Sequence, residues 1–162
     1  MDKRSLFTQI SANLRGARDQ AEQARDTAQK EANSHVGRME SRYDTFKEEA
    51  QYEVAAQELR IRQYQDGINQ IGGLIEDASN LKPNKTIRVG SIVILEPEGG
   101  KERCYILSPA GGGILAKDGD TSVFTLTPDS PLGKQLVGLE EGDECALDLG
   151  ESKTNYLVKK VL

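Results

Sequence analysis

A group of carboxylates stands in the middle of the N-terminal half, and these side chains are well suited to chemistry. Asp44 and Glu48 lie four residues apart, and Glu49 follows directly. Carboxylate oxygens are the ligands that hard divalent cations such as Mg²⁺ prefer. The residues alone leave two interpretations open: the carboxylates hold a metal ion, or they belong to a solvated helix surface with ordinary ion pairs.

Charge is distributed unevenly around these carboxylates. Residues 3–38 carry seven basic and four acidic side chains, whereas residues 40–53 carry two basic and five acidic ones. The N-terminal half is therefore mildly basic up to the point where an acidic segment begins. The sharper of the two interpretations is that this acidic segment forms a tip that delivers its carboxylates to a metal ion.

The elements that must position the carboxylates are two long helices. All five prolines lie at or after Pro83, so residues 1–82 lack the strongest helix breaker. Mostly apolar residues recur at spacings of three and four, which predicts two helices packed along their length. The first stripe contains Ile10, Leu14, Ala17, Ala21, Ala24 and Ala28, and the second contains Val54, Gln57, Ile61, Tyr64, Ile68, Ile71, Ile75 and Ala78.

We expect these helices to form an antiparallel hairpin, because each stripe then covers the other. Symmetry places the turn near residues 39–45, with Asp44 or Thr45 as the N-cap of the second helix, and Gly37 is a competing end of the first. Each helix would have about 35 residues and a length of about 50 Å at 1.5 Å per residue. The acidic segment, near residues 40–49, then forms the tip of a hairpin over residues 1–82.

The second half of the chain predicts a small, mostly antiparallel β domain over residues 86–162. Short β-rich runs alternate with turn signals such as Asp118-Gly119-Asp120. Ser130 is expected to cap one short helix, with Pro131 at its first position and Gly138 after its end. The six predicted strands cover residues 91–95, 102–107, 114–117, 123–126, 144–149 and 155–161.

Composition narrows the possible functions. The net charge of −5 argues against a protein that coats DNA, and a single His excludes a multi-histidine metal site. Cys104 and Cys145 form no CxxC pair and are expected to be small core residues in a reducing cytosol. The apolar runs are far too short to cross a bilayer, so we expect a cytoplasmic protein.

Two segments resemble motifs of the GreA/GreB transcription elongation factors. Residues 127–138, TPDSPLGKQLVG, resemble the family's SPLGKALLG helix, and Glu141-Gly142-Asp143-Glu144 resembles the GDEV strand that follows it. Residues 47–52, KEEAQY, resemble the tip motif G-D-L-[SK]-E-N-A-E-Y, with Glu48 at the motif Glu. Asp44 is the nearest match to the motif Asp and lies one residue further from Glu48 than in the family.

The resemblance implies an α+β fold, with an N-terminal antiparallel coiled-coil hairpin followed by a small FKBP-like antiparallel β domain with one short helix. It also implies a bacterial transcription elongation factor that binds RNA polymerase at the secondary channel. The β domain would dock on the polymerase, and the hairpin would enter the channel. The residues that would contact the polymerase are Ser130, Pro131, Leu132 and Lys134.

The tip carboxylates would then assist the polymerase in cleaving backtracked RNA. The resemblance implies that Asp44 and Glu48, with a lesser part for Glu49, help to hold Mg²⁺ in the active site of the polymerase. The protein would be an accessory factor and not an enzyme, with no cofactor of its own. It would be a monomer when free, because the hairpin satisfies its own stripes.

Three alternatives remain open at this point. A divergent relative would occupy the channel and modulate or inhibit transcription without stimulating cleavage. An FKBP-like domain could instead be a prolyl isomerase or chaperone, although Tyr105, Phe124 and Tyr156 are the only aromatic residues of this half. A coiled-coil adaptor would use the two stripes to dimerise.

Overall fold

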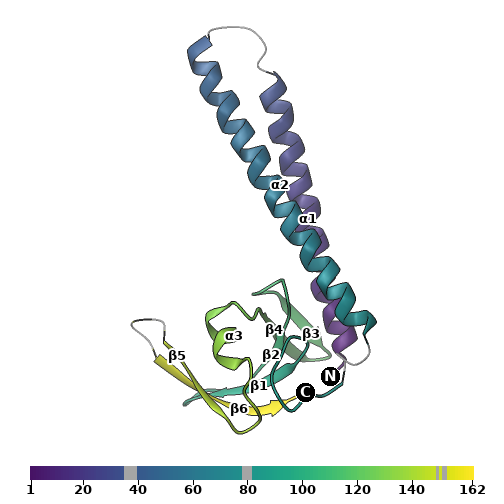
Figure 1. Ribbon diagram of the computed structural model, residues 1–162, viewed down its shortest axis with the longest axis vertical. Coiled ribbons are helices and arrows are strands. Elements are labelled where there is room, and N and C mark those ends of the chain that lie inside the picture. The colour runs from purple at the N-terminus through teal and green to yellow at the C-terminus, as the bar shows by residue number, and fades with distance from the viewer. Residues whose placement is uncertain (35–39, 78–81, 149, 151–152) are drawn as a thin grey trace. The chain divides into compact units, whose positions relative to one another are not determined.

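The residues that the structure describes form two long helices and a six-stranded sheet with one short helix (Figure 1). The computed structural model describes residues 1–34, 40–77, 82–148, 150 and 153–162, with the backbone alone for residues 40–44. The chain divides into two compact units, Met1–Asn13 with Gly67–Leu162, and Leu14–Asp66. The helices α1, Lys3–Ser34, and α2, Glu40–Glu76, each contribute to both units.

The two predicted stripes are the buried faces of α1 and α2. Ile10, Leu14, Ala21 and Ala28 are buried along α1, and Gln57, Ile68 and Ile71 are buried along α2. The other described members of both stripes are half-buried, while Ala78 lies outside the described residues. The predicted heptad pattern is therefore confirmed over the described part of both helices.

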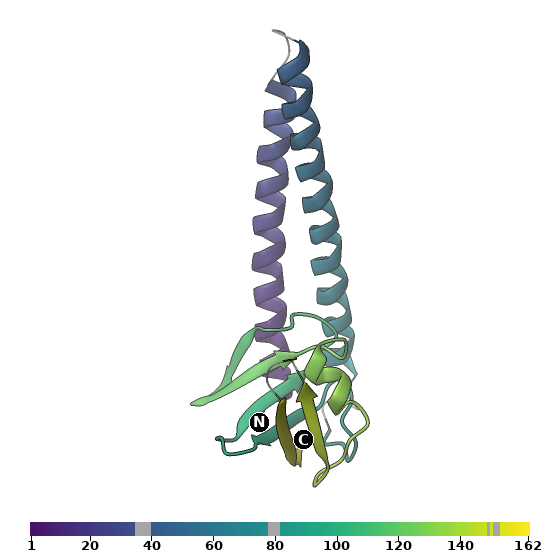
Figure 2. The same ribbon diagram turned by 90° about the vertical axis from the view of Figure 1, so that its left-hand side faces the viewer.

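Within Leu14–Asp66, α1 and α2 run side by side in opposite directions (Figures 1 and 2). Arg18 Nη1 of α1 donates a hydrogen bond to Gln65 Oε1 of α2 at 2.9 Å. Within Leu14–Asp66, Arg18 lies near the first residue of the unit and Gln65 near its last, so this contact joins opposite ends of the segment. The predicted antiparallel hairpin is confirmed.

The predicted N-cap of the second helix is wrong. α2 begins at Glu40, so Asp44 and Thr45 lie inside the helix and not at its end. No glycine or proline occurs between Arg38 and Thr45, so nothing in the local sequence stops the helix from extending back to Glu40. The competing signal, Gly37, lies outside the described residues.

The sheet contains β1 (Ile92–Pro97), β2 (Arg103–Leu107), β3 (Leu115–Asp118), β4 (Thr121–Leu126), β5 (Glu144–Asp148) and β6 (Lys153–Val161), in the order β3-β4-β2-β1-β6-β5. Among these strands four pairings are antiparallel, and β2 pairs with β4 in parallel. The sheet is therefore mixed but mostly antiparallel, which confirms the predicted domain, and the parallel pairing of β2 with β4 is the detail that the sequence did not indicate. The chain reverses once between β3 and β4, and β4 inserts beside β2, so these two strands share a direction.

One face of the sheet is packed against the short helix α3, Pro131–Leu136. Leu132 and Leu136 join a buried cluster with Val93, Leu107 and Val158 of the sheet. Burial of these side chains holds α3 on the sheet. Each large aliphatic side chain that is removed from water contributes about 1.5–3 kcal/mol to the free energy of folding. None of the described helices is both long and apolar enough to cross a membrane.

By its contacts, the start of α1 belongs with the sheet. Gln9 Nε2 donates to the backbone oxygen of Lys117 at 2.8 Å, and Gln9 Oε1 accepts from the backbone N–H of Lys117 at 3.0 Å. Lys117 lies on β3, which is an edge strand with free backbone groups. The side-chain amide of Gln9 therefore pairs with this edge as a peptide group of a neighbouring strand would.

Candidate functional site

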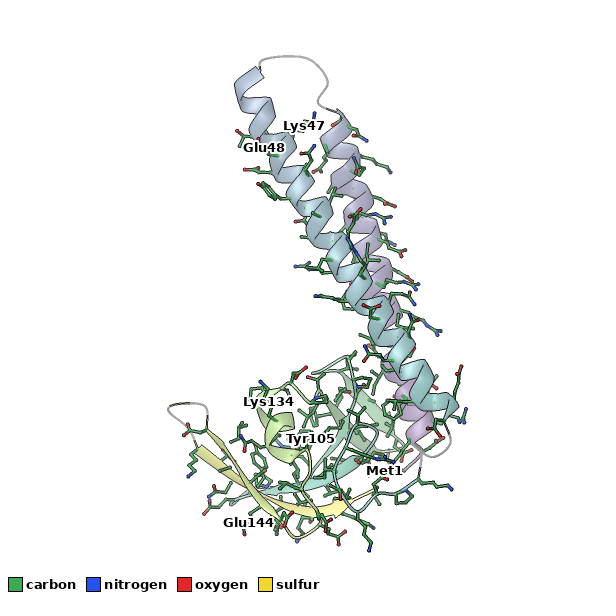
Figure 3. All side chains as sticks on the ribbon, viewed as in Figure 1. Met1, Lys47, Glu48, Tyr105, Lys134 and Glu144 are labelled. Carbon is green, nitrogen blue, oxygen red and sulfur yellow. The ribbon has the colours of Figure 1, made fainter. Side chains whose placement is uncertain are left out.

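The candidate carboxylates lie in the first turns of α2, at the end of Leu14–Asp66 where α1 finishes and α2 starts. Glu48 is exposed on α2 (Figure 3). Asp44 lies four residues earlier in the same helix, which places both residues on one helix face. The side chain of Asp44 is outside the described part of the structure. Within the part that is described, Glu48 and Glu49 form no ion pair.

Glu49 faces a different direction from Glu48. It lines a pocket of about 240 Å³ between the helices, together with Glu31 of α1 and Glu53 of α2. Glu53 accepts a hydrogen bond of 2.6 Å from Gln57 Nε2. No group of three or more acidic, His or Cys side chains among the described residues is arranged to hold a metal ion. The structure thus separates Glu49 from the face that Asp44 and Glu48 share.

The Ser130–Leu136 segment follows the predicted cap chemistry. Ser130 is the N-cap of α3, and its Oγ accepts from Gly133 N at 3.1 Å and donates to the Thr127 oxygen at 2.7 Å. Pro131 occupies the start of the helix, where its missing N–H costs no hydrogen bond. Gly138 follows the helix with a φ of 91°, a conformation that favours glycine.

Gly133 explains why this segment needs its sequence. A Cβ placed on Gly133 would lie 2.0 Å from the Thr127 oxygen and 2.8 Å from Ser130 Oγ. Only glycine allows the helix to pass this close to the preceding turn. The segment is therefore constrained by its own packing, whatever it binds.

The four predicted partner-binding residues have different environments. Pro131 and Lys134 are exposed and available to another molecule. Ser130 is half-buried and holds the turn, and Leu132 is only 7 % exposed within the core cluster. Sequence reasoning could not separate these roles, because burial depends on which sheet residues α3 meets. Figure 3 shows Lys134 on α3.

The sheet domain has surface pockets among its described residues, and two of them bear on the isomerase alternative. One, of about 340 Å³, is lined by three carboxylates (Glu96, Glu98 and Glu144) and one aromatic residue, Tyr156. The Glu96 carboxylate pairs with Lys159 Nζ at 3.0 Å. The other, of about 430 Å³, contains Phe124 as its aromatic residue. Neither has the several aromatic walls that we expect around a bound prolyl peptide, so the isomerase alternative gains no support.

The cysteines are packing residues. Cys104 is buried with its Sγ 3.6 Å from Met1 Sδ, and Cys145 is half-buried against the core cluster. Burial, assisted by the Asp118 carboxylate, raises the pKa of the Cys104 thiol to about 11. A thiol with so high a pKa is a poor nucleophile at neutral pH. The prediction of small core residues is confirmed for Cys104 and holds in part for Cys145.

The protein thus combines a helical hairpin with a mixed-sheet domain that carries the capped helix α3. Residues 82–162, half of the chain, match the family model described as "Transcription elongation factor, GreA/GreB, C-term". The chain therefore belongs to the GreA/GreB family of transcription elongation factors, as the sequence motifs predicted.

Solved structures of similar chains were also found. The transcription factor Gfh1 is 22 % identical, with a TM-score of 0.40, and the match covers 97 % of this chain and 93 % of that chain. Gfh1 of Thermus thermophilus is 20 % identical at a TM-score of 0.38, over 98 % and 95 % of the two chains. A GreA/GreB factor from Nitrosomonas europaea is 17 % identical at 0.37, over 66 % and 91 %. The curated protein sequences gave no significant match.

Proposed function

We propose that this protein binds bacterial RNA polymerase at the secondary channel and uses its tip carboxylates to stimulate cleavage of backtracked RNA. Membership of the GreA/GreB family supports the polymerase as partner. The polymerase would be the catalyst, and this protein an accessory factor that acts in the cytoplasm. The helices α1 and α2 contain 32 and 37 residues. At 1.5 Å per residue each is about 50 Å long, which is a suitable length for reaching into a channel.

The observation that carries the proposal is the shared helix face of Asp44 and Glu48. In the family motif the corresponding residues are three apart, whereas here they are four apart. Because α2 begins at Glu40, the four-residue spacing lies within a helix, and residues four apart in a helix lie on the same face. The altered spacing therefore keeps the two residues together.

Asp44 and Glu48 would contribute carboxylate oxygens to Mg²⁺ in the polymerase active site. When bound, the ion stabilises the attacking and leaving oxygens of phosphoryl transfer. The Glu48 carboxylate is exposed and has no ion pair with the side chains that the structure describes, which suits a site that is completed by ligands from another molecule. Glu49 would contribute less, because it faces the pocket with Glu31 and Glu53.

Docking on the polymerase would use the exposed side of α3. Lys134 and Pro131 are the candidates for direct contact. Ser130 and Leu132 would act indirectly, by fixing the position of α3. This assignment separates two kinds of mutation: changes at Lys134 should alter binding alone, and changes at Leu132 should alter the fold first.

The proposal is tested by RNA cleavage in a backtracked polymerase complex. Wild-type protein should stimulate cleavage, and D44A/E48A should lower that stimulation about a hundredfold while still binding polymerase, because preorganised electrostatic groups contribute this much to catalysis. Glu76→Ala removes a carboxylate from the opposite end of α2 and serves as the control, with full stimulation expected. Unchanged cleavage by D44A/E48A would refute the tip role.

The same experiment separates the family's two modes of action. Wild-type protein that binds polymerase but gives no cleavage in any backtracked complex would point to a channel occupant that modulates or inhibits transcription. Absence of polymerase binding by the intact protein would remove the proposal altogether.

A further inference from the structure

The outer face of α2 carries an exposed apolar strip within Leu14–Asp66. Tyr52 is 77 % exposed and Leu59 is 55 % exposed, and Ala55 and Ala56 between them are exposed as well. At 100° per residue these positions lie on one side of the helix. The buried stripe that contains Gln57 lies on the opposite side. The strip is therefore a surface that the hairpin does not cover.

Charged residues frame this strip with opposite signs at its two ends. Glu48 and Glu49 lie before Tyr52, and Arg60 and Arg62 lie after Leu59. All four side chains are exposed, and Arg62 makes a long contact of 3.8 Å with Glu58. Glu48 and Arg62 each lie seven residues from Ala55, whereas Glu49 lies six and Arg60 five residues from it, and the exposed Glu53 and Glu58 lie on the flanks of the strip.

We propose that this strip, residues 48–62 of α2, binds the same strip of a second copy of the chain in antiparallel orientation. A two-fold axis near Ala55 places Tyr52 against Leu59 of the second copy, and it places Leu59 against Tyr52 of that copy. The small side chains of Ala55 and Ala56 allow the helices to approach closely at the centre. Apolar contact at the middle and charge at both ends give a self-complementary surface.

The charge pattern is what selects a second copy as the occupant. About this axis Glu48 meets Arg62 of the second copy on one side of the strip, and Glu49 meets Arg60 on the other side. The helical angles agree, because Glu48 and Arg62 lie to the same side of Tyr52, as do Glu49 and Arg60 to the opposite side. Each pair forms twice by symmetry, which gives four contacts of opposite charge.

Self-association of this kind has a functional consequence. Glu48 belongs to the paired surface, so the associated form covers a carboxylate that the free form exposes. At high protein concentration the Glu48 carboxylate would be covered, and dilution would expose it again. This surface is distinct from the two heptad stripes, which are already satisfied within the hairpin and on which the expectation of a monomer was based. The proposal therefore replaces that expectation at high protein concentration.

Two charge-reversed variants test the proposal without any polymerase. One carries R60E and R62E, and the other carries E48R and E49R. Each alone places like charges in contact and should weaken self-association about tenfold or more. An equimolar mixture of the two restores every opposite-charge pair and should associate at least as tightly as the wild type. Sedimentation velocity over a concentration series measures all four samples.

Matched controls keep the result interpretable. Circular dichroism establishes that each variant retains its helices, and Arg15→Glu on α1 should leave association unchanged. Wild type that stays monomeric at every concentration, or a mixture that fails to associate, would overturn the proposal. If wild type is monomeric while Y52S/L59S loses polymerase binding, the strip belongs to the polymerase interface and self-association is wrong.

Discussion

The capped α3 segment and the acidic start of α2 both match family motifs, yet the structure treats them differently. Around α3, Ser130 completes a cap, Leu132 fills the core and Gly133 prevents a collision with the preceding turn. At the start of α2, Glu48 and Glu49 are exposed, and they make no ion pair within the described residues. One motif is needed by the fold, and the other has no evident structural task.

This difference shows that a motif match can reflect either a requirement of the fold or a requirement of the function. The α3 segment identifies the family strongly because packing restricts its residues, and most of that restriction concerns stability. The carboxylates of α2 match the family more weakly, and Glu48 and Glu49 make no ion pair with other described residues, so their role stays a prediction that activity must test. Variants whose stability and activity are measured separately test this contrast.

The largest expected effect is the loss of folding stability when Gly133 is replaced. Gly133→Ala should destabilise the protein by about 4 kcal/mol or more, because the new Cβ would lie 2.0 Å from the Thr127 oxygen. Gly16→Ala in α1 is the matched change, since a Cβ there meets no described atom within 4 Å. It should stabilise the helix by about 1 kcal/mol. Urea unfolding of both variants measures this difference, and equal effects would contradict the contrast.

A pair of leucine truncations comes next. Leu132→Ala should cost about 3 kcal/mol, because it leaves a cavity in the core cluster. Leu59→Ala, on the exposed face of α2, should change stability by less than about 0.5 kcal/mol. Chemical denaturation gives both values. A large loss from Leu59→Ala would mean that this face is covered in the free protein.

The Cys104 thiol should make stability depend on alkaline pH. Its pKa is raised from 9.0 to about 11 on folding, so the folded state holds the proton more tightly. The stabilisation is complete below pH 9 and is lost as the pH rises towards 11, with a total of roughly 2 kcal/mol. Cys104→Ala should remove this component. The comparison of unfolding free energies near neutral pH and above the ordinary thiol pKa checks it, and identical pH profiles would refute it.

The smallest expected effect concerns the join between α1 and the sheet. Gln9→Ala removes two hydrogen bonds to Lys117 and should cost about 1 kcal/mol. Its clearest sign is local, because the Lys117 amide should lose protection from hydrogen exchange. Gln20→Ala, at an exposed position further along α1, provides the control. Unchanged protection at Lys117 would show that the edge of β3 is closed in another way.

Much of the fold was predictable because its signals are local or periodic. Spacings of three and four placed both helices, and turn residues separated all six strands. The Ser130 cap and the Pro131 start were also correct, since capping needs only residues within one turn. The N-cap at Asp44 or Thr45 failed for a related reason: a suitable capping residue is necessary for a helix start but does not prevent a helix from continuing past it.

Other features depend on which distant segments meet, and the sequence does not encode these by periodicity. Turn signals predicted reversals but not that β4 would insert beside β2 in parallel. The burial of Leu132 depends on the sheet beneath α3, and the pairing of Gln9 with Lys117 joins residues that are 108 positions apart.

The sequence alone specified the elements and the acidic segment, because short-range sterics and hydrophobic spacing act within a few residues. Only the tertiary structure decided which motif residues are buried and that Glu48 and Glu49 face different surroundings, because burial depends on contacts between segments far apart in the chain.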